Sequence, residues 1–399
     1  MRFTHLADCH LGGWRFEALK KLNMESFKFA VDFTIKNKSD FMLIAGDLFD
    51  SAYPRIDIIG ATFEQFKLLK DAKIPVYLIS GSHDYSASGK TFLDLLEASG
   101  LCINVGNHNV EEDISILLPP TFHKDIAIYG YPGKKSGLEL KHMKRTYIED
   151  NDKFRILMIH STITDVIGTL PIESVNTNHL PKADYYAFGH IHVKFEKFEN
   201  GHTFVYPGPT FPNNSKELRQ LRHGSFHSVE VDDNRNIKTE SIDIPTNEVL
   251  LIEHKIKNPS NSYTEVFNIF SDLDLEDKII ILRLSGNITR NQHSDIKFDE
   301  IRRHLKEKKA LVFLHNTSQI NIILEDCAEQ TFMKKNFKEI EKETFNKFIK
   351  DNPTSFNKNH QALFSALLLE KEDKETKAKF ADRLIKKVSE VLDIEDELK

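Results

Sequence analysis

The feature that most constrains the fold is a series of short apolar runs, each of strand length, that end in a turn residue or a histidine. Up to about residue 243 these runs include "FMLIAG", "PVYLIS", "DIAIYG", "FRILMIH" and "DYYAFGH". Such runs, alternating with polar helical or loop stretches, are typical of buried strands in an α/β domain. One such stretch, 17–36, is predicted to be the first helix. Polar side chains at the strand ends favour a site at the edge of an open sheet.

Composition limits the classes of protein that the chain can belong to. No apolar run approaches the roughly 18 residues of a membrane span, and no signal peptide precedes the first strand, so we expect a cytoplasmic protein. Three widely spaced cysteines suggest neither a disulfide framework nor a thiolate zinc cluster. The net charge of −6 argues against nucleic-acid binding by global positive charge. The 18 histidines are more informative, because imidazole is the commonest metal ligand.

A chain of 399 residues is too long for one ordinary core. The stretch "SIDIPTNEV" is a plausible boundary between an N-terminal domain, 1–243, and a small domain, 244–326. The small domain shows a strand, helix and strand pattern in "KIIILRLSG", "FDEIRRHLKEK", "ALVFLH" and "INIILE". The remaining residues, 327–399, are charged, with apolar residues at helical spacing over 332–349 and in a last helix. This helical tail either folds back on its own protein or binds a partner, and both interpretations stay open.

Five segments place possible metal ligands where an apolar strand gives way to a loop. They are "LADCHLG", "AGDLFD", "SGSHD", "MIHS" and "FGHIH". Oxygen and imidazole ligands without thiolates suit Mn²⁺, Fe²⁺ or Zn²⁺ better than Ca²⁺, and two such ions about 3.5 to 4 Å apart form a clamp for phosphoryl chemistry. An isolated Asp-x-His or His-x-His pair is more often incidental than a metal site. The five segments together favour a two-metal centre.

The chain resembles the calcineurin-like metallophosphoesterases in "DCH", "GDLFD", "GSHD", the single His160 and the paired His190 and His192. The flanking stretches "HLADCHLG", "GDLFDSAYP" and "YPGPTFPNN" are similar, more narrowly, to the SbcD-type nucleases of double-strand-break repair. This resemblance covers the N-terminal domain. It implies an α/β sandwich of two mixed sheets flanked by helices, followed by a small α/β capping domain and a helical C-terminal tail.

The resemblance also implies a role for each residue of the five segments. The metal ligands would be Asp8, His10, Asp47, Ser82, His160, His190 and His192. Asp47 would bridge two divalent ions, expected to be Mn²⁺, and water activated by them would attack the phosphodiester. His83 would stabilise the developing charge or protonate the leaving oxygen. Asp50 would orient the His83 imidazole, although a turn or helix-cap role for Asp50 stays open.

Residue 82 departs from the family, which usually has asparagine there. The Ser82 hydroxyl could bind the second ion directly, through a water, or not at all, and we expect a functional but looser second site. Asp84 is expected to have a structural role or to support the ligands from behind, and Cys9 would point away from the ligands if its segment is extended. His5 and His227 match none of the five segments, so surface or core positions are expected for them.

By resemblance, the protein is a two-metal, Mn²⁺-dependent DNA exonuclease and endonuclease that processes DNA ends in double-strand-break repair. Its partners would be DNA, a second copy of the chain, and a coiled-coil ABC-type ATPase of the SbcC family bound by the tail, at the nucleoid in the cytoplasm. Lys90, Lys134 and Lys135 are candidate DNA contacts, with solvated surface as the other interpretation. Two other functions stay open: a calcineurin-like phosphodiesterase acting on a small molecule, and a non-enzymatic scaffold protein that bridges DNA ends.

Overall fold

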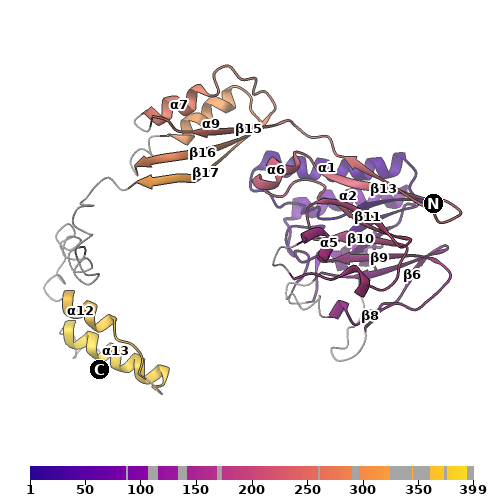
Figure 1. Ribbon diagram of the computed structural model, residues 1–399, viewed down its shortest axis with the longest axis horizontal. Helices are drawn as coiled ribbons and strands as arrows, with labels where there is room; N and C mark the ends of the chain where they lie inside the picture. The colour runs from indigo at the N-terminus through magenta and orange to yellow at the C-terminus, as the bar shows by residue number, and fades with distance from the viewer. Residues whose placement is uncertain are drawn as a thin grey trace. The chain divides into compact units, whose positions relative to one another are not determined.

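The structure is a computed structural model of the chain, and it has two compact units, residues 1–323 and residues 324–399 (Figure 1). The residues that it describes are 1–86, 89–106, 116–133, 142–168, 173–258, 261–289, 296–323, 344, 360–372 and 375–392. Among the helices of these residues, none has the length and apolar character needed to cross a membrane.

Two six-stranded sheets form the main body of the first unit. The first sheet has the order β14 (Ile237–Asp243), β13 (Ser225–Val231), β1 (Arg2–Leu6), β2 (Phe41–Ala45), β3 (Val76–Ile79) and β4 (Ile103–Asn104). The second has the order β11 (Lys194–Glu199), β12 (His202–Pro207), β10 (Tyr185–Gly189), β9 (Phe154–His160), β7 (Ile126–Tyr131) and β6 (Thr121–His123). Both sheets are mixed, because their central strands run parallel while β13, β14, β11 and β6 join antiparallel neighbours. The predicted sandwich of two mixed sheets is therefore confirmed.

Helices and short connections surround the two sheets. The helices of this part are α1 (Glu17–Lys36), α2 (Ile56–Asp71), α3 (Phe92–Ala98), α5 (Thr164–Ile167) and α6 (Ser215–Leu221), with a 3-10 turn at Thr177–His179. The short strands β5 (Ile116–Leu117) and β8 (Thr146–Tyr147) pair with each other. Helix α1 has the bounds that the sequence predicts, and its inner face, with Phe27, Ala30, Val31 and Thr34, is buried.

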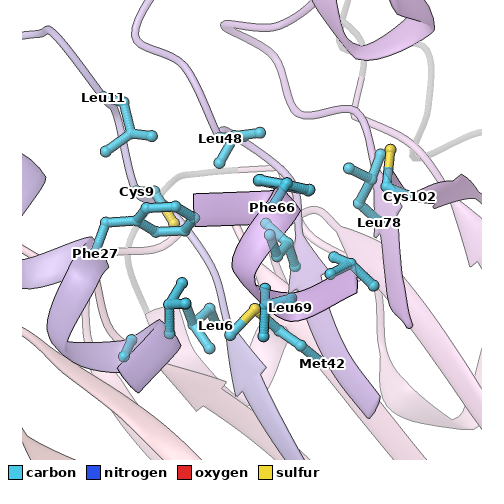
Figure 2. Close-up of a cluster of buried hydrophobic side chains, with 14 of the residues drawn as sticks. Leu6, Cys9, Leu11, Phe27, Met42, Leu48, Phe66, Leu69, Leu78 and Cys102 are labelled. Carbon is cyan, nitrogen blue, oxygen red and sulfur yellow. The ribbon is translucent and has the colours of Figure 1, made fainter. Parts of the chain in front are cut away.

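The alternation of side chains along the strands builds a separate core on each side of the first sheet. In β2, Met42 and Ile44 pack with helices α1 and α2, whereas Leu43 and Ala45 pack against the second sheet. Figure 2 shows the helix-side core, in which Phe27 from α1 lies among side chains from α2 and the strands. Because both faces of β2 are covered, its residues are all buried and its sequence is continuously apolar.

A three-stranded parallel sheet completes the first unit. Its order is β15 (Val249–Lys255), β16 (Ile279–Thr289) and β17 (Val312–Ile323), and α7 (Ser262–Asn268) and α9 (Phe298–Glu307) accompany it. These elements share their own apolar core. A second cluster joins this sheet to the main body, with Trp14 and Phe211 packed with Val249 and Leu314. The residues of "ALVFLH" from Val312 on and the described residues of "INIILE" belong to the single strand β17.

The described part of the second unit contains two helices, α12 (His360–Leu367) and α13 (Lys377–Leu392), which pack against each other. Arg383 of α13 forms a 2.9 Å ion pair with Glu375, just before that helix begins. The predicted helical segment 332–349 lies outside the described residues except for Thr344. The domain boundaries after residues 243 and 326 stay predictions.

Candidate metal centre and active site

The two sheets bring the five ligand-bearing segments to one edge of the sandwich. Strands β1, β2 and β3 are neighbours in the first sheet, and β9 and β10 are neighbours in the second. Each of the five segments begins at the carboxyl end of one of these strands. The loops after β1 and β2 continue the pairing of their strands, since the Asp8 amide donates to Gly46 O at 3.1 Å and the His10 amide donates to Asp47 O at 2.9 Å.

The backbone at this edge is locally strained. Asp8, His10, Asp47 and His190 have φ angles of 52°, 43°, 50° and 93°, in a region that residues with a side chain rarely adopt. Such conformations persist only where the surrounding structure enforces them, and they concentrate at functional sites. The segment after β1 is therefore a turn instead of the extended segment considered above. Cys9 nevertheless lies away from the ligands, fully buried in the helix-side core (Figure 2).

Carboxylate oxygens and imidazole nitrogens converge here within metal-ligand reach. Among the described residues, three groups have ligand atoms within 4.8 Å of one another: Asp8, His10 and His192; Asp8, Asp47 and His160; and His10, Asp50 and His83. The first group shares Asp8 with the second and His10 with the third, so the three form one continuous cluster. Hard oxygen and borderline nitrogen donors of this kind suit divalent transition metals.

Three histidines have their Nδ1 atoms directed at oxygen partners. His160 Nδ1 lies 2.9 Å from Ala45 O, His192 Nδ1 lies 3.0 Å from Glu217 Oε1, and His10 Nδ1 lies 3.2 Å from Asp50 Oδ1. The hydrogen bond to Ala45 O holds the proton on His160 Nδ1 and leaves Nε2 as a metal donor, whereas His10 Nδ1 has no hydrogen-bond partner in the described chain and is near Asp50 at ion-pair distance only. His10 Nε2 and His192 Nε2 face each other at 3.1 Å.

Two further observations indicate that these residues suit a bound cation. His160 Nε2 is buried without a hydrogen-bond partner and lies 3.2 Å from Asp47 Oδ2. Burial lowers the pKa of His160, but the nearby Asp47 and Asp8 carboxylates outweigh burial and raise it to about 9. The same negative field that holds a proton on this imidazole would hold a divalent cation.

Asp47 lies at the centre of the cluster. Burial raises the pKa of its carboxyl, but His160, His10 and the His83 amide outweigh that effect and hold it well below the usual range. Its Oδ1 atom accepts a 2.8 Å hydrogen bond from the His83 amide, which joins the loops after β2 and β3. Gly81 makes this close approach possible, because a Cβ atom at residue 81 would lie 2.1 Å from Asp47 Oδ1.

Asp84 connects the same two loops through hydrogen bonds. Its carboxylate accepts hydrogen bonds from the amides of Leu48, Phe49 and Gly81 at 3.2, 3.0 and 3.0 Å, and the side chain is buried. Burial and the nearby Asp47 raise the pKa of Asp84 to about 6. Its contacts agree with the structural role expected from the sequence.

His83 is the most exposed side chain of the cluster. Its Nδ1 atom lies 2.8 Å from the backbone oxygen of Asp50, and its side chain is 45% exposed. The Asp50 carboxylate is 3.7 Å from His83 Nδ1 but 3.2 Å from His10 Nδ1. Asp50 therefore contacts the His83 ring mainly through its carbonyl, whereas its carboxylate lies closer to His10.

His190 and Ser82 lie beside the cluster but outside the three groups. The His190 amide donates to both carboxylate oxygens of Asp8, at 2.9 and 3.1 Å. Its ring stands edge-on to His160, with centroids 5.1 Å apart, and burial and His160 lower its pKa. Ser82 is half-buried between Gly81 and His83. The role of each as a ligand to the second ion stays a prediction.

The expected DNA-contacting lysines are only partly described. Lys90 is exposed, two residues before α3 begins. Lys134 and Lys135 lie outside the described residues.

Two residues that contact the cluster, Asn213 and Glu217, were not predicted from the sequence. Glu217 contacts His192 as described above and accepts a 2.8 Å hydrogen bond from the Asn213 amide, while Asn213 Nδ2 donates to Asp50 Oδ1 at 3.3 Å. The signal that could have revealed Glu217 is a helix start: Asn214 caps α6, with Glu217 three residues later. The link from Glu217 to His192 depends on the tertiary structure.

The comparisons with known proteins agree with this geometry. The profile of the calcineurin-like phosphoesterases matches residues 1–194, which include all five ligand-bearing segments. The chain is 26% identical over 344 residues to the DNA double-strand break repair protein Mre11 of Archaeoglobus fulgidus, covering 77% of this chain and 76% of that protein. It is 28% identical over 351 residues to Mre11 of Methanococcus maripaludis, covering 83% and 89%. It is 26% identical over 302 residues to the SbcD component of the SbcCD nuclease of Staphylococcus epidermidis, covering 66% and 78%. The resemblance seen in the sequence is thereby confirmed, and residues 1–194 form a calcineurin-like phosphoesterase domain.

Proposed function

We propose that this chain is a two-metal DNA nuclease that uses Mn²⁺ and acts on DNA ends in double-strand-break repair, with both exonuclease and endonuclease activity. The observation that carries the proposal is the continuous cluster of carboxylates and imidazoles at the edge of the two sheets. The names of the similar Mre11 and SbcD proteins support DNA as the substrate.

Each side of the cluster has a role in the proposed reaction. Asp8, His10 and His192 would hold one ion, and His160, His190 and Ser82 the other, with Asp47 between them. When bound, two divalent cations neutralise charge on the phosphodiester and activate water for in-line attack. Asp50 and Glu217 orient the imidazoles of His10 and His192, so that each presents Nε2 to the site.

His83 is the proposed group for stabilising or protonating the leaving oxygen. Its Nδ1 atom is engaged by the Asp50 carbonyl, which leaves Nε2 for the substrate. Its greater exposure compared with the buried His10 and His160 suits a group that meets the substrate. A general acid must reach the reacting oxygen directly or through one water, and an exposed imidazole at the rim can do so.

The proposed partners beyond DNA are an SbcC-type ATPase and a second copy of the chain. The described part of the tail supports the first, because Leu367 at the end of α12, Leu368 directly after it and Ile385 in α13 are 56%, 60% and 55% exposed. Exposed Ile56 and Leu68 on α2, at 87% and 46%, support association through the phosphoesterase domain. In this proposal residues 244–326 are a capping domain that helps to position DNA, residues 327–399 bind the ATPase, and the assembly acts at the nucleoid.

The test is digestion of linear, hairpin and circular DNA with Mn²⁺, Mg²⁺ or a chelator, with and without the ATPase. We expect Mn²⁺-dependent cleavage in wild type and its loss in Asp47→Ala, since one substitution removes the ligand between the two ions. Cleavage of a chromogenic phosphodiester without cleavage of any DNA would favour the small-molecule phosphodiesterase. Metal binding and DNA bridging without cleavage of either substrate would favour the non-enzymatic scaffold.

A further inference from the structure

Two exposed tyrosines belong to the two loops that carry Asp50 and His83. Tyr85 follows His83 by two residues and is 42% exposed, and Tyr53, in the loop between β2 and α2, is 67% exposed. A single exposed large side chain needs no special explanation, but two aromatic side chains on the loops that form a candidate catalytic site do. Their position suggests contact with a substrate.

Hydrogen bonds join the two loops that carry the tyrosines. The Tyr53 hydroxyl and Ser86 Oγ are 2.9 Å apart, so the loop after β2 is tied to the segment that contains Tyr85. The Asp50 carbonyl is 2.8 Å from His83 Nδ1 and ties the same two loops together. Asp84, between His83 and Tyr85, is fixed by backbone amides from both loops. The two aromatic side chains are thus attached to the framework that positions His83.

We propose that Tyr53 and Tyr85 stack on the nucleobase next to the scissile phosphate, an inference that rests on the proposed nuclease function. A phosphodiester bound beside His83 carries a nucleoside on each side, so one base reaches the rim. Tyrosine suits this contact because it offers a large, rigid face with little rotamer entropy to lose. Stacking also tolerates any base, since every base has a π face.

The contact restricts the kind of DNA that the site accepts. A base inside a duplex is already stacked on its neighbours and must leave the stack before it can meet a tyrosine. Unstacking is least costly in a single strand or at a frayed end. The two tyrosines therefore favour single-stranded DNA and open ends over the interior of a duplex.

The test compares an oligothymidylate with a fully abasic oligomer of the same length, which keeps the phosphodiester backbone and lacks the bases. Binding and kcat/KM are measured in Mn²⁺ for wild type, Tyr53→Ala, Tyr85→Ala and Tyr85→Phe. We expect each alanine variant to lose about tenfold in kcat/KM and affinity on oligothymidylate, which corresponds to about 1.4 kcal/mol. On the abasic oligomer these variants should match wild type, and Tyr85→Phe should match it on both substrates.

Phe198 provides a matched control, because it is 73% exposed on the edge strand β11 of the second sheet. Phe198→Ala should leave both substrates unaffected. Equal losses on the two oligomers in the tyrosine variants would overturn the inference, since they would show that the tyrosines only support the His83 loop. A wild-type protein that binds oligothymidylate better than the abasic oligomer but cleaves neither would refute the proposed nuclease function while supporting the stacking contact.

Discussion

Gly81→Ala tests the convergence of the loops after β2 and β3 with a single added carbon atom. A Cβ atom at residue 81 would lie 2.1 Å from Asp47 Oδ1 and 2.3 Å from the Asp47 amide nitrogen, whereas ordinary contact begins at 3.4 Å. The two loops must therefore separate by about 1.3 Å. Metal sites tolerate changes of only about 0.2 Å in ligand distance, and a misplacement of about 1 Å can cost roughly 100-fold in rate.

We expect Gly81→Ala to reduce Mn²⁺-dependent cleavage by at least about 100-fold and to weaken Mn²⁺ binding. Overpacking of a well-packed region also costs about 1 to 3 kcal/mol of the free energy of unfolding. The strain is purely steric, because Gly81 is absent from the residues with positive φ in the described chain and alanine can adopt its backbone conformation.

Gly60→Ala is the matched control for this substitution. Gly60 lies in the middle of α2, and a Cβ atom there would meet nothing within 4 Å. Alanine should therefore raise the free energy of unfolding by about 0.5 to 1 kcal/mol and leave cleavage unchanged. Calorimetric titration with Mn²⁺ and cleavage of linear DNA compare the two variants. Wild-type Mn²⁺ affinity and activity in Gly81→Ala would refute the close approach of these two loops.

Three further outcomes are expected. His83→Ala should retain both metal ions, measured by elemental analysis, and lose turnover; a parallel fall in metal content would make His83 a ligand. Ser82→Asn should need less Mn²⁺ than wild type for half-maximal activity, because an amide oxygen is a better donor than a hydroxyl; an equal requirement, with a collapse in Ser82→Ala, would make the serine a full ligand. Burial lowers the pKa of His227 to about 4 in the folded protein, whereas in the unfolded chain it is about 6.5. Between these two pH values the unfolded chain binds a proton at His227 and the folded protein does not. The free energy of unfolding should then fall by about 1.4 kcal/mol per pH unit down to about pH 4, and urea titrations of His227→Gln should lack that part of the slope.

Local patterns were sufficient to predict much of the fold. Helix α1 has its predicted bounds because its apolar residues recur at helical spacing over one continuous stretch. The apolar runs are strands because short, continuously apolar segments can be buried on both faces of a central strand. In the small domain, the strand β15 and helix α7 precede the predicted pattern and were not recognised.

The candidate site was predictable only as a set of residue types at strand ends. Asp8, Asp47 and His160 stand out in the sequence because each follows or ends an apolar run. The oxygen atom that lies beside each imidazole could not be predicted from the sequence in the same way. His192 and Glu217 are 25 residues apart and meet because helix α6 starts beside the loop after β10.

The sequence by itself determined the chemistry of the ligands and the strands that carry them, because residue type and local periodicity belong to neighbouring positions along the chain. Tertiary structure decided which ligands meet. His10 and His192 are separated by 182 positions, and their Nε2 atoms lie 3.1 Å apart only because the central strands of two packed sheets end at the same edge. It also decided that the Asp50 carboxylate lies nearer His10 than His83, since the backbone of each loop fixes the directions of its side chains. Such directions are set by long-range packing, which no local pattern encodes.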